Sequence, residues 1–320
     1  MTLASGPADD PAPAAPAGRS GWQRAVRRAY GVALLLAAVA VMALRRDEVA
    51  DLLDGARPAP LVGALLLGLA SLLQTAWFWS RSLTHLGAPR PLGAVLEATV
   101  AAIPGRYVPG SIWYAVGRVG HLRRSGTPGA TLGLVAVLET LLSFVVAVAL
   151  GGALLLSAGI DDSGLGIVTL GAFAVGLALV ASPWVVNPVV RWVAARRGLG
   201  DVPSLRWPAY AELVGHLVAF WLASAAAFLL YLEAFPAIDA PGAVRTAGTF
   251  LVAWAAGFIA VFAPQGAGVF ETTIAGLLDG PLVALALVIA GYRALTAVRD
   301  ALALLALAVA RPRTPDRRPS

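Results

Sequence analysis

The sequence predicts an all-α polytopic membrane protein, and three observations carry this prediction. Of the 320 residues, 58% are hydrophobic and 13% are charged, whereas a soluble domain carries roughly 25% charged residues. The apolar residues fall into runs close to the ~20 residues that a hydrocarbon core requires. Arginine-rich segments separate these runs, and the mean hydropathy is +0.77. A soluble domain is therefore excluded, and residues 21–310 are interpreted as one transmembrane domain.

The two ends of the chain differ from this domain. Residues 1–20 are rich in Pro, Ala and Gly, a composition that buries too little apolar surface to offset the entropy of ordering. They are predicted to be a disordered tail. Residues 311–320 carry four Arg and are predicted to be a basic cytoplasmic tail. Arg24, Arg27 and Arg28 precede the first apolar run. Both termini are therefore expected on the cytoplasmic side of the cytoplasmic membrane.

All 24 basic residues are Arg, and the net charge is +6. A guanidinium group binds phosphate or carboxylate through two parallel hydrogen bonds and stays charged when desolvated. The heavy use of Ala, Gly and Leu offers another reading, since a GC-rich genome produces the same bias. The arginines lie between apolar runs and form no basic domain, which argues against nucleic-acid binding. The absence of Cys excludes disulfides and thiolate chemistry.

Six apolar runs are interpreted as full spans, and two further regions are interrupted by Pro and Gly. The interrupted regions, 92–120 and 243–279, are predicted to be re-entrant helical hairpins, because non-helical backbone at membrane depth must be buried in protein or line a wet cavity. The first would enter from the cytoplasm and the second from outside. Eight full spans are the alternative, and both arrangements leave the termini inside. The six spans are 29–44, 60–79, 131–158, 165–190, 209–235 and 281–310.

The two breaks have similar compositions and lie in opposite halves of the chain. This pattern raises the hypothesis of an inverted repeat with a central site, an arrangement that many transporters have. Ordinary Pro and Gly kinks are the alternative.

Ionisable residues inside or beside the apolar runs are the candidate functional residues. Each costs roughly 2.5 to 3.5 kcal/mol at a helix centre, so each should face a partner or a hydrated cavity. The alternative role is an Arg–Glu pair that only fixes helix packing. The set comprises Glu97, Arg106, Arg118, Glu139, Glu212, His216, Glu271 and Arg293.

Arg106 and Arg118 flank the first break. A half-helix from about Ser111 would bring its free N–H groups and positive dipole end to Arg106, an anion site suited to phosphate. An arginine that snorkels to the interface is the alternative.

At the second break, Glu271 could pair with Arg293, take up a proton or sit in the first turn of a helix, where the dipole stabilises a carboxylate. Glu212 and His216 are four residues apart and share a helix face, which would suit a proton relay. A solvated pair at the cytoplasmic end of a span is the alternative.

No catalytic signature accompanies these residues. The three histidines are far apart in sequence and form no HExxH, and no GxSxG, P-loop or GxGxxG is present. Asp161 and Asp162 are interpreted as a solvated turn in an outer loop. No catalytic residue, metal or cofactor is therefore expected.

Three stretches resemble the transmembrane region of the lysylphosphatidylglycerol synthase family, the lipid-flipping half of multiple-peptide-resistance proteins. They are residues 106–118 (RYVPGSIWYAVGR), residues 264–271 (PQGAGVFE) and the pair Tyr292 and Arg293. The likeness in hydropathy covers roughly residues 22–310.

The chain also departs from the family pattern. Gln265 and Ala267 alter a Pro-Gly-Gly-Leu-Gly run, and Phe270 stands where the family commonly has Arg. No soluble synthase domain is attached, so the resemblance does not imply aminoacylation of lipid.

The resemblance implies flippase-like translocation of an anionic phospholipid, with membrane lipids as partners. One alternative is a non-catalytic membrane partner of a glycosyltransferase or another cell-envelope enzyme, and another is an intramembrane enzyme that acts on lipid. The expected head-group contacts are Arg106, Tyr107, Pro109, Gly110, Arg118, Gly266, Gly268 and Arg293. The expected charge-balancing or proton-coupled residues are Glu139, Glu271, Glu212 and His216.

Overall fold

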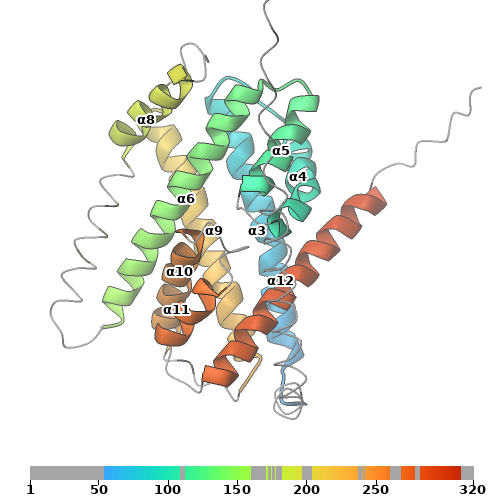
Figure 1. Ribbon diagram of the computed structural model, residues 1–320, viewed down its shortest axis with the longest axis vertical. Helices are drawn as coiled ribbons and strands as arrows, with labels where there is room; N and C mark the ends of the chain where they lie inside the picture. The colour runs from blue at the N-terminus through green and yellow to red at the C-terminus, as the bar shows by residue number, and fades with distance from the viewer. Residues whose placement is uncertain are drawn as a thin grey trace, which may run out of the picture. The chain divides into compact units, whose positions relative to one another are not determined.

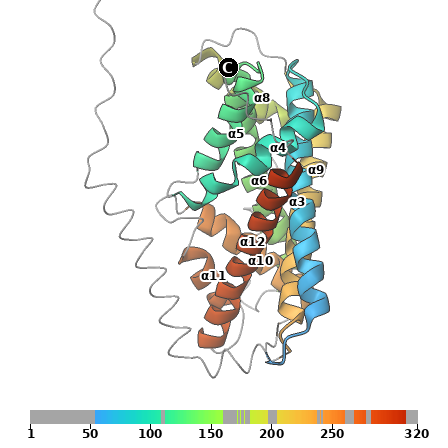
Figure 2. The same cartoon turned by 90° about the vertical axis from the view of Figure 1, so that its right-hand side faces the viewer.

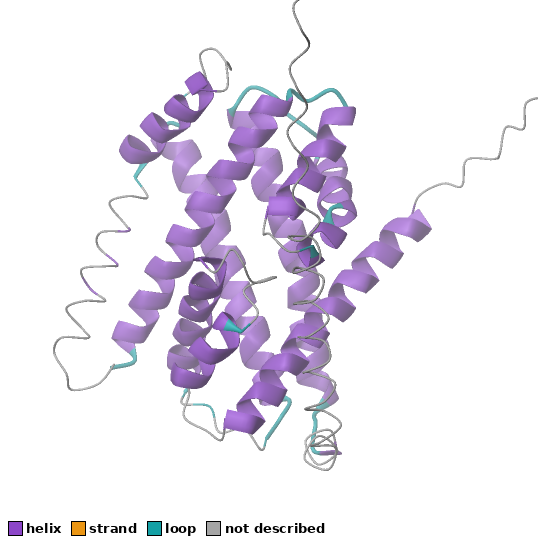
Figure 3. Cartoon of the chain, in the orientation of Figure 1, coloured by secondary structure: helices purple, strands orange, loops and turns teal. Residues whose placement is uncertain are grey.

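The structure is a computed structural model, and every regular element that it describes is a helix (Figure 3). The predicted tails 1–20 and 311–320, the predicted span 29–44 and most of the predicted span 165–190 lie outside the described residues. So do Pro109, Gly110 and Gly266. The described residues all belong to one compact unit, Leu44–Ser320. They are 54–108, 112–159, 171, 174, 177, 182–196, 204–236, 240, 242–259, 268–277 and 282–310.

Within the described residues, three helices are long and apolar enough to cross a membrane. They are α3 (Pro58–His85), α6 (Gly129–Ser157) and α9 (Trp207–Glu233). Each has 27 to 29 residues, so each is roughly 40 Å long, which exceeds the ~30 Å hydrocarbon core. The prediction of an all-α protein with membrane-crossing helices is confirmed at this level, while the number of spans and their orientation stay predictions.

Local sequence signals begin and end these helices. Pro occupies the first turn of α3 and of α9, where its fixed φ suits a helix start. At the other end of α3, Gly87 has a φ of +75°. The N–H groups of Gly87 and Ala88 donate to the carbonyls of Thr84 and Leu83, the hydrogen-bond pattern of a Schellman motif. The helix α3 thus continues past Trp79, the predicted end of the span, to His85, and the point at which it leaves the membrane stays a prediction.

The long helices surround the largest buried side chains. α3 packs along α9, and both contact α6. Trp79 on α3 and Phe228 on α9 are fully buried. The indole N–H of Trp221 donates to the Ser143 carbonyl at 3.0 Å and so joins α9 to α6. This core holds the three helices in a fixed arrangement against which the shorter helices lie.

Two pairs of short helices pack on opposite halves of α6 (Figures 1 and 2). The first pair is α4 (Leu92–Ala101) and α5 (Ile112–Arg124), with the 3₁₀ helix η1 (Ile103–Tyr107) between them. The second pair is α10 (Ala243–Ile259) and α11 (Val269–Leu277). At 10 and 9 residues, α4 and α11 are only ~15 Å long and too short to cross a membrane.

Contacts with α6 show the same division. Arg118 of α5 reaches Glu139 in the first half of α6, whereas Gly248 of α10 lies against Gly151 in its second half. The first pair therefore occupies the end of the bundle that the arginine pattern assigns to the cytoplasm. This arrangement agrees with two half-membrane hairpins from opposite sides, and their membrane placement stays a prediction.

Two further helices complete the described part. α8 (Pro183–Arg196) extends past Val190, the predicted end of a span, and includes Arg191 and Arg196. α12 (Leu282–Ala310) is one continuous helix of 29 residues. It runs obliquely across the bundle (Figure 1) and contacts α3, α4, α9 and α11.

Candidate functional site

The first break positions an arginine over an aromatic ring. Gly105 in η1 lies so close to the first turn of α5 that a Cβ there would stand 2.6 Å from the Trp113 carbonyl oxygen and 2.9 Å from the Tyr114 nitrogen. Only glycine permits this approach. The guanidinium carbon of Arg106, the next residue, consequently lies 4.1 Å from the centroid of the Tyr114 ring, within the range of a cation–π interaction.

Arg118 lies one helical turn beyond Tyr114 and contacts the same ring. Its guanidinium carbon is 4.4 Å from the ring centroid of Tyr114 and 4.4 Å from that of Trp79 on α3. The side chain is 0% exposed. Its Nη1 donates to both carboxylate oxygens of Glu139 on α6, at 3.1 and 3.2 Å. Arg106 and Arg118 therefore share Tyr114, and Glu139 balances the buried arginine.

The ion pair with Glu139 uses only one of the three guanidinium nitrogens of Arg118, the Nη1 atom. Its Nε and Nη2 atoms are buried and have no hydrogen-bond partner among the described residues. An unmade hydrogen bond of a buried group costs about 1 to 3 kcal/mol, and more when the group is charged. The Nε and Nη2 atoms form one edge of the planar fork, the geometry that binds phosphate or carboxylate with two parallel bonds.

A second cluster joins the first break to α12. Asp300, which is 3% exposed, accepts hydrogen bonds from the Tyr107 hydroxyl at 3.1 Å and from Arg106 Nη1 at 3.5 Å. It also accepts from Arg299 Nε and Nη2 at 2.9 and 2.6 Å. Together with Arg118 and Glu139, this group contains three guanidinium groups and two carboxylates, and so has one net positive charge.

The second break holds a carboxylate in two ways. Glu271 Oε1 accepts from Arg293 Nε on α12 at 3.1 Å, and Oε2 accepts from the Gly268 backbone N–H at 2.6 Å. Glu271 lies in the first turn of α11, so the latter contact is half of a capping box. Of the alternatives for Glu271, the ion pair and the first-turn position are both present. The guanidinium carbon of Arg293 also lies 4.8 Å from the centroid of the Phe270 ring.

A third cluster surrounds Glu212 where α3 ends and α9 begins. Both Nε and Nη2 of Arg81 donate to its carboxylate, the latter at 3.2 Å. His85 Nε2 lies 2.9 Å from Glu212 Oε2, and His216 Nε2 lies 3.8 Å from Oε1. The Glu212 and His216 side chains are therefore neighbours, as their spacing predicts. Sequence reasoning missed Arg81 and His85, although they have the same four-residue spacing on the facing helix.

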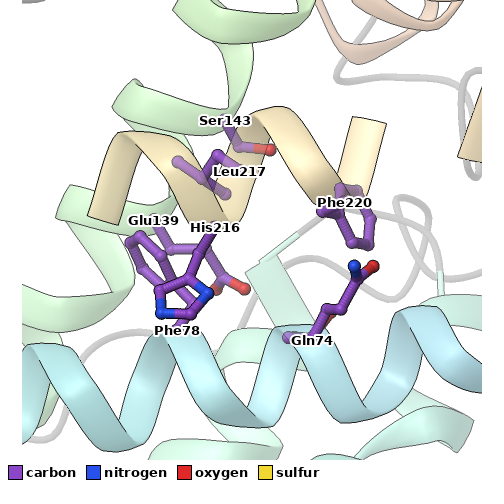
Figure 4. A pocket seen from close by; sticks show the side chains of 8 residues that line it. Gln74, Phe78, Glu139, Ser143, His216, Leu217 and Phe220 are labelled. Atoms are coloured by element: carbon purple, nitrogen blue, oxygen red, sulfur yellow. The ribbon is translucent and has the colours of Figure 1, made fainter. Parts of the chain in front are cut away.

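A small cavity separates the Arg118–Glu139 pair from the Glu212 cluster. The centre of a water molecule has about 30 Å³ open to it there, more than the about 10 to 15 Å³ that one water requires. Figure 4 shows side chains of α3, α6 and α9 around it, including Glu139 and His216. The lining residues are Gln74, Thr75, Phe78, Glu139, Ser143, His216, Leu217 and Phe220.

The structure thus gathers the expected site residues into three groups. Arg106, Tyr107, Arg118 and Glu139 meet at the first break, Gly268, Glu271 and Arg293 meet at the second, and Glu212 lies beside His216. Asp300 and Tyr114 were missed. An acidic residue inside an apolar run was a sequence signal that could have identified Asp300. Nothing in the sequence distinguished Tyr114. Within the described ranges, no cluster of three or more His, Cys, Asp or Glu side chains could hold a metal ion.

Comparison with known proteins finds no matching family model and no matching curated protein.

Proposed function

We propose that this protein translocates the head group of an anionic phospholipid across the cytoplasmic membrane, with the first break as the head-group site. The observation that carries the proposal is the buried Nε and Nη2 edge of Arg118, which has no hydrogen-bond partner in the part of the chain that the structure describes. A membrane phosphate is the abundant ligand whose charge and geometry match this edge. The likeness of residues 106–118 to a lipid-flipping family adds to this argument.

The neighbouring groups give the phosphate a second contact. Arg106 is held by Asp300 at 3.5 Å, a long hydrogen bond that an incoming phosphate can replace. Glu139 keeps Nη1 of Arg118 and fixes the direction of the free edge. Tyr107 and Val108 are 48% and 44% exposed, so the break is open to lipid on one face, and the acyl tails stay outside the protein while the head group enters.

Lipid movement in liposomes tests the proposal. The purified full chain is reconstituted with acyl-labelled phosphatidylglycerol or phosphatidylcholine, and the label in the outer leaflet is quenched. We expect the protein to move phosphatidylglycerol faster than phosphatidylcholine. Arg106→Ala removes one charged contact, worth about 1.5 to 3 kcal/mol, and should slow this movement by about 10- to 100-fold.

Arg124→Ala is the matched control, because Arg124 is exposed at the far end of α5 and bonds only to His121 in the described contacts. It should move lipid at the wild-type rate. If the wild-type chain moves no lipid, or if Arg106→Ala behaves as wild type, the proposal is wrong. Absence of movement would favour the alternative role as a membrane partner of an envelope enzyme.

A further inference from the structure

The cavity between α3, α6 and α9 lies between two charged groups that the sequence separates. On one wall is Glu139, whose carboxylate is bound by Arg118. On the other is His216, which lies beside Glu212. Ser143 and Gln74 add a hydroxyl and an amide to the lining, and the Gln74 Oε1 atom is buried with no hydrogen-bond partner among the described residues. These polar groups in an otherwise apolar lining supply the two to four hydrogen-bond partners that a bridging water needs.

Each wall has its own charge balance. Glu139 faces Arg118 from α5, and Arg106 from η1 also acts on it electrostatically. His216 faces Glu212 on its own helix, and the same carboxylate binds Arg81 and His85 from α3. A phosphate at the Nε and Nη2 edge of Arg118 would bring a second anion to the arginine that already binds Glu139. A proton on Glu139 relieves this excess of negative charge.

We propose that the cavity is a proton-binding and transfer site that couples proton movement to the head group, an inference that rests on the proposed function. When the phosphate reaches Arg118, Glu139 takes a proton from the bridging water, and that water takes one from protonated His216. An O–H bond forms on Glu139 and an N–H bond breaks on His216. His216, which is 21% exposed, regains its proton from solvent beside Glu212. When the phosphate leaves for the opposite leaflet, the O–H bond of Glu139 breaks and its proton passes to water that enters the vacated head-group site. One proton therefore accompanies one anionic head group.

A pH gradient across liposomes tests this coupling. The full chain is reconstituted with acyl-labelled phosphatidylglycerol and a pH-sensitive dye inside. Because lipid and proton move together, phosphatidylglycerol should accumulate in the leaflet that faces the alkaline side. For one-to-one coupling, a gradient of about one pH unit corresponds to about a tenfold difference between leaflets, and the dye should report proton movement as lipid moves.

Variants locate the path. His216→Gln should reduce proton movement per lipid by at least about tenfold. Glu139→Gln keeps an oxygen for Arg118 but removes the group that takes the proton, so whatever rate of lipid movement this variant has should not respond to the gradient. His121→Gln is the control, since His121 lies beside Glu97 at 3.7 Å and outside the cavity, and it should behave as wild type.

The outcomes separate this inference from the proposed function. If the wild-type chain moves phosphatidylglycerol but the leaflets stay equal under a gradient and the dye reports no proton movement, the inference is overturned and the proposed function stands. If no lipid moves at any pH, both are wrong. Wild-type coupling that persists unchanged in His216→Gln would overturn the assigned path, and the wild-type measurement decides the coupling even if a variant fails to fold.

Discussion

Arg293 and Asp300 lie seven residues apart on α12 and fasten this helix to two different breaks. Arg293 donates to Glu271 at the start of α11, and Asp300 accepts from Arg106 and Tyr107 in η1. Residues seven apart point to the same side of a helix. α12 therefore presents a positive charge to α11 and a negative charge to η1. A shift of this helix along its axis would alter both ion pairs together.

Asp300→Asn should increase the affinity for an anionic head group and slow its release. The Asp300 carboxylate forms ion pairs with Arg106 and Arg299. Removing its charge therefore frees both guanidinium groups to donate to phosphate. One charged hydrogen bond gained corresponds to about a tenfold or larger change in the dissociation constant. Calorimetric titration of the purified protein with short-chain phosphatidylglycerol measures it.

Asp54→Asn is the control for that titration, because Asp54 is exposed at the start of the described chain. Unchanged affinity in Asp300→Asn would show that Arg106 does not contact the head group.

The contribution of the Arg118–Glu139 pair to stability should be separable from its contribution to lipid movement. Arg118→Met leaves the Glu139 carboxylate, which is 21% exposed, without its partner, and breaking a buried pair in this way costs up to about 3 to 5 kcal/mol. The double variant Arg118→Met, Glu139→Leu removes both charges and should regain most of this stability. It should nevertheless move no phosphatidylglycerol. Thermal unfolding and the liposome assay measure the two properties, and a double variant that transports as wild type would reduce the pair to a packing device.

Gly105→Ala should separate η1 from α5. The new Cβ would stand within 3.0 Å of three backbone atoms of Trp113 and Tyr114, so the backbone must shift, and Arg106 would leave the Tyr114 ring. We expect lipid movement to fall by about tenfold or more, because small misplacements of contact groups are costly. Gly120→Ala on α5, where a Cβ meets nothing within 4 Å, should be neutral or slightly stabilising. Equal rates in the two variants would contradict this role for η1.

Gly248→Ala should weaken the contact of α10 with α6. Its Cβ would lie 2.8 Å from Leu155 Cγ and 3.0 Å from the Gly151 carbonyl oxygen. Small residues allow helices to approach closely in membranes, and overfilling such a contact costs about 1 to 3 kcal/mol. Thermal unfolding in detergent should show the loss, whereas Gly133→Ala on α6, with open space around its Cβ, should unfold at or above the wild-type temperature.

The helices themselves were predictable from composition and breaks. The apolar runs predicted to begin at Pro60 and Ala209 correspond to α3 and α9, which begin at Pro58 and Trp207. Helix ends were less predictable, because side chains such as His85 continue a helix when a partner such as Glu212 satisfies them. The short helices α4 and α11 were predictable because Pro and Gly interrupt their runs.

The site was predictable as a set of residues but not as a set of contacts. Ionisable residues in apolar runs are costly and therefore stand out, which selected Arg118 and Glu139. Their pairing joins positions 21 residues apart on different helices and depends on packing that no local pattern encodes. Asp300 escaped notice because Arg299 beside it offers a local partner, although the structure also brings it to Arg106.

Cross-linking to a lipid head group tests the head-group site most directly. The chain has no Cys, so a single Cys in place of Val108, beside the break, reacts alone with a phospholipid that carries a maleimide on its head group. Leu222→Cys on α9, similarly exposed at 47%, is the comparison. We expect Val108→Cys to react faster, and excess phosphatidylglycerol, but neither phosphatidylcholine nor inorganic phosphate, to suppress the reaction. Equal labelling at both positions, or labelling at Val108→Cys that phosphatidylglycerol leaves unchanged, would contradict a head-group site at the first break.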